Sequence, residues 1–131
     1  MQVLTTAPGD RDPLLRAFDG ASGLAVVSLC AAWCDTCTQF RAAFERIAAA
    51  RPQIAFVWLD IEDDSAVCGD VDVENFPTLA VYRGGAPVHF GVSLPQEGTV
   101  ARLIDALAER SVPLADAPLP VHELPGLISR R

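Results

Sequence analysis

The feature that most constrains the fold is an apolar run, Leu24–Cys30, that gives way within a few residues to an amphipathic helical pattern. The run has strand length and is too uniform to alternate, which predicts a strand buried on both faces of a sheet. In the pattern that follows, apolar residues recur every three or four positions, as on the buried face of a helix: Cys37, Phe40, Phe44 and Ile47. A Cys-x-x-Cys pair, Cys34 and Cys37, therefore stands at a strand-to-helix junction.

The other patterns predict an α/β fold, with a mixed central sheet flanked by helices on both faces. One helix is expected to begin with Asp12 as its N-cap and Pro13 as its first residue, and to end at Gly20 and Gly23. Two more helices are expected, a short one at Ser65–Cys68 and a longer one at Gln96–Arg110. The expected strands are a second buried strand at Ile54–Ile61, a hairpin of Leu79–Tyr82 and Val88–Phe90 around Gly84-Gly85, and an edge strand at Gln2–Thr6.

The composition divides the chain into a domain, residues 1–110, and a proline-rich C-terminal extension, residues 111–131. Four prolines in the extension argue against a regular helix there: Pro113, Pro118, Pro120 and Pro125. Its apolar side chains favour docking on the domain over free solvation, with dimerisation and disorder as the alternatives: Val121, Leu124, Leu127 and Ile128.

Charge and hydropathy exclude several function classes. The net charge is −7 and all ten basic residues are arginine, which argues against nucleic-acid binding and rules out lysine-based chemistry. The N-terminus has no basic cluster followed by an apolar core, and no apolar run is long enough to cross a membrane. We therefore expect a cytoplasmic protein, in which four cysteines are redox or metal groups more often than structural disulfides.

The position of the cysteine pair suggests how it would react. Cys34 lies where unpaired backbone N–H groups and the helix dipole stabilise a thiolate, which is the attacking species in disulfide exchange. Cys37 lies one turn later on the buried face of the helix. We expect Cys34 to attack a substrate disulfide and the shielded Cys37 to resolve the mixed disulfide.

The motif Trp33-Cys34-Asp35-Thr36-Cys37, together with Phe76-Pro77-Thr78 later in the chain, resembles the thioredoxin family. The resemblance spans residues 2–110 and implies a thioredoxin fold with a redox disulfide between Cys34 and Cys37. It also implies a cis peptide bond before Pro77 and substrate contacts by the following residues: Trp33, Asp35, Thr36, Phe76, Pro77, Gly91 and Val92. Implied partners are disulfide-containing proteins and a flavin-dependent thioredoxin reductase as electron donor, for a monomer without a cofactor.

The chain departs from the family pattern at positions that matter for the chemistry. Asp35-Thr36 replaces the usual Gly-Pro, and the Asp35 carboxylate disfavours a neighbouring thiolate. Ser28 stands where the family usually buries an aspartate as a proton carrier, and Trp58 replaces the lysine that often partners it. Water or a nearby acid such as Asp60 would then carry the proton. We therefore predict a reducing couple with slower exchange than in ordinary thioredoxins.

Other readings of the cysteines and acidic residues remain open. The spacing Cys30-x3-Cys34-x2-Cys37 is also that of iron–sulfur ligands, and with Cys68 four thiols could bind zinc. We interpret Cys30 and Cys68 instead as small core residues and expect no metal. His89 is expected at a sheet edge and His122 in solvent, and the acidic residues from Asp60 to Asp64 are expected to form a solvated loop.

Two functions follow from these patterns. The first is a thiol–disulfide oxidoreductase that reduces disulfides in protein substrates. The second is a thioredoxin-like binding or adaptor module whose redox activity is weak or incidental, an alternative that the altered residues between the cysteines favour.

Overall fold

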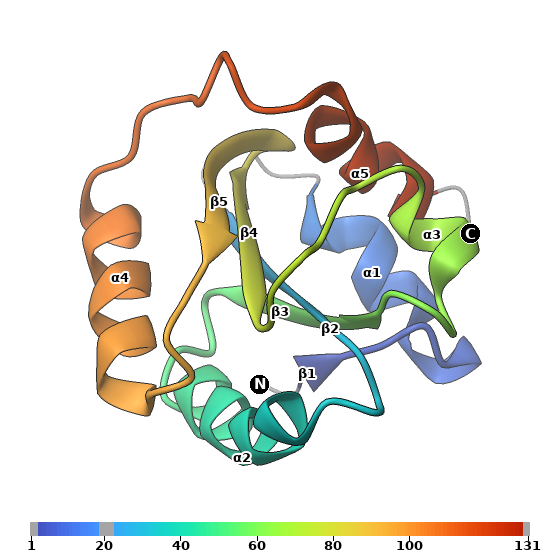
Figure 1. Cartoon of the computed structure of the whole chain (residues 1–131). Coiled ribbons are helices and arrows are strands. Elements are labelled where there is room, and N and C mark those ends of the chain that lie inside the picture. The colour runs from blue at the N-terminus through green and yellow to red at the C-terminus, as the bar shows by residue number, and fades with distance from the viewer. Residues whose placement is uncertain (1–2, 19–22, 130–131) are drawn as a thin grey trace.

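The computed structural model describes residues 3–18 and 23–129 (Figure 1). The predicted start of the edge strand at Gln2 and the helix-ending signal at Gly20 lie outside the described residues. Within the described ranges, none of the helices combines the length and the apolar character needed to cross a bilayer.

A five-stranded mixed sheet forms the centre of the fold, in the order β1-β3-β2-β4-β5 (Figure 1). Its strands are β1 (Val3–Leu4), β2 (Leu24–Cys30), β3 (Ala55–Asp60), β4 (Thr78–Arg83) and β5 (Ala86–Val92). β3 pairs in parallel with β1 and β2, whereas β4 pairs antiparallel with β2 and β5. All seven residues of β2 are buried, as predicted for a central strand covered on both faces.

Helices cover both faces of this sheet, which confirms the α/β fold class. They are η1 (Pro8–Asp10), α1 (Arg11–Ala17), α2 (Asp35–Ala49), α3 (Ser65–Cys68), α4 (Glu97–Glu109) and α5 (Leu119–Ser129). Side chains of α2 and α4 share one apolar core with Val26 and Val81, and side chains of α1, α3 and α5 share the other with Val27 and Tyr82. Because neighbouring strand residues face opposite sides, each strand contributes to both cores.

The hairpin and the first helix show how local chemistry sets the boundaries. Gly84 and Gly85 have φ values of 62° and 83°, in the left-handed region that a tight hairpin requires and that glycine adopts without strain. The first α-helix begins at Arg11 rather than after Asp12, with Asp10 as its N-cap residue. Pro13 then lies in the first turn, where a missing backbone N–H costs no helical hydrogen bond.

The extension contains a helix, so the prediction that its prolines exclude one was wrong. Pro120 lies in the first turn of α5, where proline is tolerated, and Pro125 lies inside the helix. Without an N–H, Pro125 leaves the carbonyl of Val121 unpaired, and the buried Tyr82 hydroxyl donates to that carbonyl over 2.7 Å. The docking that the apolar residues predicted is present, because Val121, Leu124 and Ile128 are buried against the domain.

Candidate functional site

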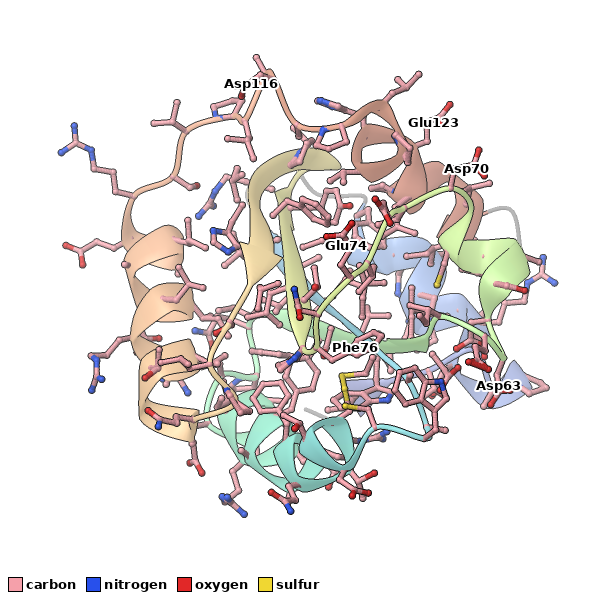
Figure 2. All side chains as sticks on the ribbon, viewed as in Figure 1. Asp63, Asp70, Glu74, Phe76, Asp116 and Glu123 are labelled. Carbon is pink, nitrogen blue, oxygen red and sulfur yellow. A yellow bond between two sulfur atoms is a disulfide. The ribbon has the colours of Figure 1, made fainter. Side chains whose placement is uncertain are left out.

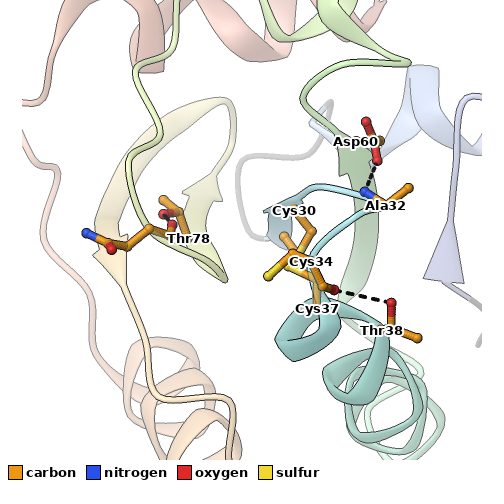
Figure 3. Close-up of a disulfide and its surroundings, with 9 residues drawn as sticks. Cys30, Ala32, Cys34, Cys37, Thr38, Asp60 and Thr78 are labelled. Atoms are coloured by element: carbon orange, nitrogen blue, oxygen red, sulfur yellow. Dashed lines mark hydrogen bonds between the residues drawn. A yellow bond between two sulfur atoms is a disulfide. The ribbon is translucent and has the colours of Figure 1, made fainter.

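The cysteine motif lies where β2 ends and α2 begins, as the sequence predicted (Figure 3). Cys34 is the N-cap residue of α2, with an extended backbone (φ −89°, ψ 117°), and its thiol is free and partly exposed. Its amide donates to the carbonyl of Ala31 over 3.0 Å, and the Thr38 hydroxyl donates to the Cys34 carbonyl over 3.2 Å. The loop is thereby fixed on both sides of the exposed sulfur, while Cys37 is buried in the first turn of α2.

The disulfide in the structure joins Cys30 to Cys37, not Cys34 to Cys37 as predicted, and Cys30 is therefore not a simple core residue (Figure 3). The strand period of two places Cys30 on the face of β2 that α2 covers, together with Val26 and Ser28. Cys37 faces it from the first turn of α2. Their Cα atoms are 5.9 Å apart, within the usual disulfide range of roughly 4.4–6.8 Å.

A buried hydroxyl, that of Ser28, lies beside the disulfide. Ser28 is fully buried, and its Oγ atom lies 3.7 Å from the Sγ atom of Cys30. Its partner across the sheet is Trp58, whose indole packs against Phe40 and Phe44 of α2. The guanidinium of Arg41 lies 5.0 Å from the centre of the Trp58 ring, which is a cation–π contact.

The acidic residues from Asp60 to Asp64 form a hydrogen-bond network within a loop in which Glu62 and Asp63 are exposed to solvent, as predicted. One carboxylate oxygen of Asp60 accepts the amide of Ala32 over 2.5 Å, next to the motif. Its other oxygen accepts the amides of Glu62 and Asp63, each over 2.9 Å. Asp64 in turn accepts the Asp60 amide over 2.8 Å. Asp60 thus holds the loop that carries Cys34.

Apolar side chains form a rim beside Cys34, and several predicted substrate-binding residues meet there. Trp33 is 64% exposed, and its ring meets the Phe76 ring edge-on with centroids 5.5 Å apart. Phe76 lies on the side of the molecule that carries the disulfide (Figure 2), and the peptide bond to Pro77 is cis. The Trp33 indole nitrogen donates to Glu62 over 2.6 Å, which fixes the ring that the rim presents.

The remaining predicted substrate-binding residues extend this rim in two directions. Val92, 58% exposed, pairs with Thr78 across β4 and β5, and Gly91 pairs with Leu79. Both therefore lie beside the segment that follows the cis bond. Asp35, exposed, and Thr36, half-buried, lie in the first turn of α2 directly after Cys34.

The other candidate ligands and acids lie apart from this site. Cys68 is buried in α3, as predicted, and burial raises the pKa of its thiol to about 12, with the carboxylates of Asp64 and Asp60 adding to the shift. His89 lies on the edge strand β5, where burial lowers its pKa, and His122 is exposed on α5. In the described ranges no three His, Cys, Asp or Glu side chains are grouped so as to hold a metal ion.

Sequence reasoning missed two contributions to the site. The disulfide role of Cys30 was available from the strand period, because alternate residues of Leu24–Cys30 must face α2. The role of Asp60 had a weaker signal, since an aspartate at a strand end often accepts backbone amides two and three residues later. Its contact with Ala32 depends on the parallel pairing of β2 and β3 and could not be read from local sequence.

Comparisons with known proteins agree with this geometry. A family model described as Thioredoxin matches residues 15–106. The thioredoxin of Chlamydia muridarum is 31% identical over 84 residues, which cover 64% of this chain and 82% of that relative. Thioredoxin-2 of Saccharomyces cerevisiae is 37% identical over 70 residues, which cover 52% of this chain and 67% of the yeast protein. The oxidised thioredoxin of Plasmodium falciparum has a TM-score of 0.63 at 21% identity, covering 81% of this chain and 98% of that structure.

Proposed function

Because the chain belongs to the thioredoxin family and is a thiol–disulfide oxidoreductase, we propose that it works in the reducing direction on the disulfides of protein substrates. The observation that carries this proposal is the contrast between two sulfurs. Cys34 has a free, partly exposed thiol at the N-terminus of α2, whereas Cys37 is buried one turn later. The exposed sulfur can meet a macromolecular disulfide, and the buried one can act only after that meeting.

The proposed reaction has two exchange steps. The Cys34 thiolate attacks one sulfur of the substrate disulfide, so that a mixed disulfide forms and the other substrate sulfur leaves as a thiolate. The Cys37 thiolate then attacks the Cys34 sulfur and releases the second substrate thiolate. Two electrons pass to the substrate, and the protons of the two cysteine thiols end on the two substrate thiols. The product on the protein is a Cys34–Cys37 disulfide.

Substrate binding is proposed to use the rim around Cys34. Trp33 offers exposed and Phe76 partly exposed aromatic surface, and apolar contact of this kind suits an extended peptide segment on either side of its cystine. The backbone of Phe76 and Pro77 would align that segment as an added strand does, with Gly91, Val92, Asp35 and Thr36 bordering it.

The electron donor, location and assembly state are proposals that rest on family membership. A flavin-dependent thioredoxin reductase would return two electrons to the disulfide, and the protein would act as a monomer in the cytoplasm. The missing buried carboxylate, replaced by Ser28, supports a slower exchange than in ordinary thioredoxins, because a serine hydroxyl does not accept a proton near neutral pH.

Reduction of insulin by dithiothreitol, followed by turbidity, tests the proposal. Wild-type protein should accelerate precipitation, and Cys34→Ser should return the rate to that of dithiothreitol alone. Cys68→Ser is the matched control, because Cys68 is a free but buried thiol in α3 and its loss should leave the acceleration in place. Equal rates for wild-type and Cys34→Ser would refute the role of Cys34.

A binding module with incidental redox activity is the second candidate. The observation that favours it is the bond between Cys37 and Cys30, which engages the resolving sulfur and leaves Cys34 without it. Such a module would not accelerate insulin reduction, yet its complexes with client proteins would persist after all disulfides are reduced. Insulin turnover by the wild-type protein decides against it.

A further inference from the structure

Three cysteines meet at the junction of β2 and α2, and the site as proposed uses only two of them. Cys30, the last residue of β2, is bonded to Cys37, and each of these residues is 1% exposed. Cys34 lies beside this disulfide with its thiol free and partly exposed (Figure 3). Cys37 therefore has two possible partners, one at the surface and one in the core.

The surroundings of Cys30 fit a sulfur that takes part in exchange. Ser28 faces the same side of β2 and is fully buried, with its Oγ atom 3.7 Å from the Cys30 sulfur. A hydroxyl at this distance can donate to the sulfur when it becomes a thiolate, and hydrogen bonding to the charged form favours that form. A serine hydroxyl also carries no negative charge that would oppose a thiolate beside it.

We propose that Cys30 is a third redox cysteine, which takes over Cys37 from Cys34 and so holds the oxidised state of the chain as a buried disulfide. This inference rests on the proposed function, which supplies the Cys34–Cys37 disulfide. The Cys30 thiolate attacks the sulfur of Cys37, a Cys30–Cys37 bond forms, and Cys34 leaves as a thiolate that takes up the proton Cys30 released. The number of disulfides is unchanged, so no outside oxidant or reductant is needed.

The exchange changes what the oxidised protein presents to solvent. A Cys34–Cys37 disulfide leaves the motif without a free thiol, whereas a Cys30–Cys37 disulfide returns a nucleophilic thiol to the surface at Cys34. The buried disulfide is also shielded from external thiols, because thiol–disulfide exchange requires access to a sulfur. The oxidised chain then keeps the capacity to form a mixed disulfide with a client protein or a small thiol.

Disulfide mapping tests this directly, because the sequence offers a cleavage site on each side of Cys34. The reduced protein is oxidised with oxidised dithiothreitol, quenched with acid, and alkylated with N-ethylmaleimide. Chymotrypsin cleaves after Trp33 and separates Cys30 from the other two cysteines; Asp-N protease cleaves before Asp35 and separates Cys37 from the other two. A Cys30–Cys37 bond keeps the fragments joined in both digests, whereas a Cys34–Cys37 bond joins them only in the Asp-N digest.

We expect more than half of the oxidised molecules to stay cross-linked in both digests, and native labelling to place about one maleimide on Cys34. In Cys30→Ala the link should move to Cys34–Cys37, and native labelling of Cys34 in the oxidised protein should fall at least about fivefold, since the thiol is then consumed. If most oxidised wild-type molecules stayed cross-linked only in the Asp-N digest, the proposal would be overturned. This result comes from wild-type protein and does not depend on whether the variant folds.

The route through Cys34 has its own test. Because Cys30 and Cys37 are buried, oxidation of Cys34→Ser should form the Cys30–Cys37 bond at least about tenfold more slowly than in wild-type protein. Equal rates would overturn the exchange step. The insulin assay is independent of this mapping. If the protein reduces insulin but its oxidised form holds a Cys34–Cys37 disulfide, only the role of Cys30 is refuted. If its oxidised form holds a Cys30–Cys37 disulfide but it does not reduce insulin, only the proposed function is refuted.

Discussion

Replacement of Asp60 should both destabilise the fold and slow the chemistry of Cys34, because one carboxylate holds three backbone amides. Those of Glu62 and Asp63 bond to one oxygen, and that of Ala32 bonds to the other. A hydrogen bond to a charged group contributes roughly 1.5–3 kcal/mol, and less where water can replace it, as it can at these exposed amides. We therefore expect Asp60→Ala to lower the free energy of unfolding by about 2–4 kcal/mol.

The asparagine variant separates the two halves of this network. Asp60→Asn keeps a carbonyl oxygen for the turn after β3 but turns an NH2 group toward the Ala32 amide, where two donors face each other. It should lower the free energy of unfolding by about 1–2 kcal/mol and slow insulin reduction roughly 3- to 30-fold, since the loop before Cys34 is less firmly positioned.

Urea denaturation and the insulin assay measure both effects on the same samples. Asp63→Ala is the matched control, because Asp63 contributes its backbone amide to the network and not its carboxylate; its stability should stay within about 0.5 kcal/mol of wild type. If both Asp60 variants also stayed within about 0.5 kcal/mol of wild type, the carboxylate would not hold the loop and the reasoning would be refuted.

Three further predictions concern the extension, the edge strand and the motif. Tyr82→Phe should lower the free energy of unfolding by about 1–3 kcal/mol, because it leaves the Val121 carbonyl without a hydrogen-bond donor. In a Pro125→Ala background the same change should cost less, because the alanine N–H at that position can replace the hydroxyl as donor. Equal costs in the two backgrounds would contradict this pairing. Burial lowers the pKa of His89 below 6.5, so folding favours the neutral imidazole. The stability that this provides is complete above about pH 6.5 and is lost as the pH falls through the lower folded-state pKa, so the urea midpoint should fall with pH in this range. This pH dependence should be weaker in His89→Gln; an unchanged dependence would contradict the prediction. Asp35→Asn should raise the rate of Cys34 alkylation by iodoacetamide about two- to fivefold, because an adjacent anion is removed; a slower rate would contradict the electrostatic argument.

The sequence predicted the elements whose signals are local. The central strand Leu24–Cys30, the helix that starts after Cys34 and the glycine hairpin each carry their pattern within a few residues, and each is present. Their order was enough for the mixed sheet, because parallel and antiparallel connections follow from the lengths between strands.

What the sequence did not reveal depends on contacts between distant residues. Proline composition argued against α5, but the hydroxyl of Tyr82 compensates the N–H that Pro125 lacks, and no local rule anticipates such a partner. Glu62 and Asp63 are exposed as predicted, but the hydrogen bond from the Ala32 amide to the Asp60 carboxylate follows only from the parallel pairing of β2 and β3. Cys37 can pair with Cys30 or with Cys34, and the spacing of the cysteines in the sequence favoured the pair Cys34–Cys37.

The central claim is that the sulfur of Cys34 attacks the disulfides of protein substrates, and trapping the mixed disulfide tests it most directly. In reduced Cys37→Ser the second step cannot occur, so incubation with insulin followed by acid quenching and mass spectrometry should show insulin linked through Cys34. An adduct through Cys30 or Cys68, or no adduct while wild-type protein still accelerates insulin reduction, would contradict the account.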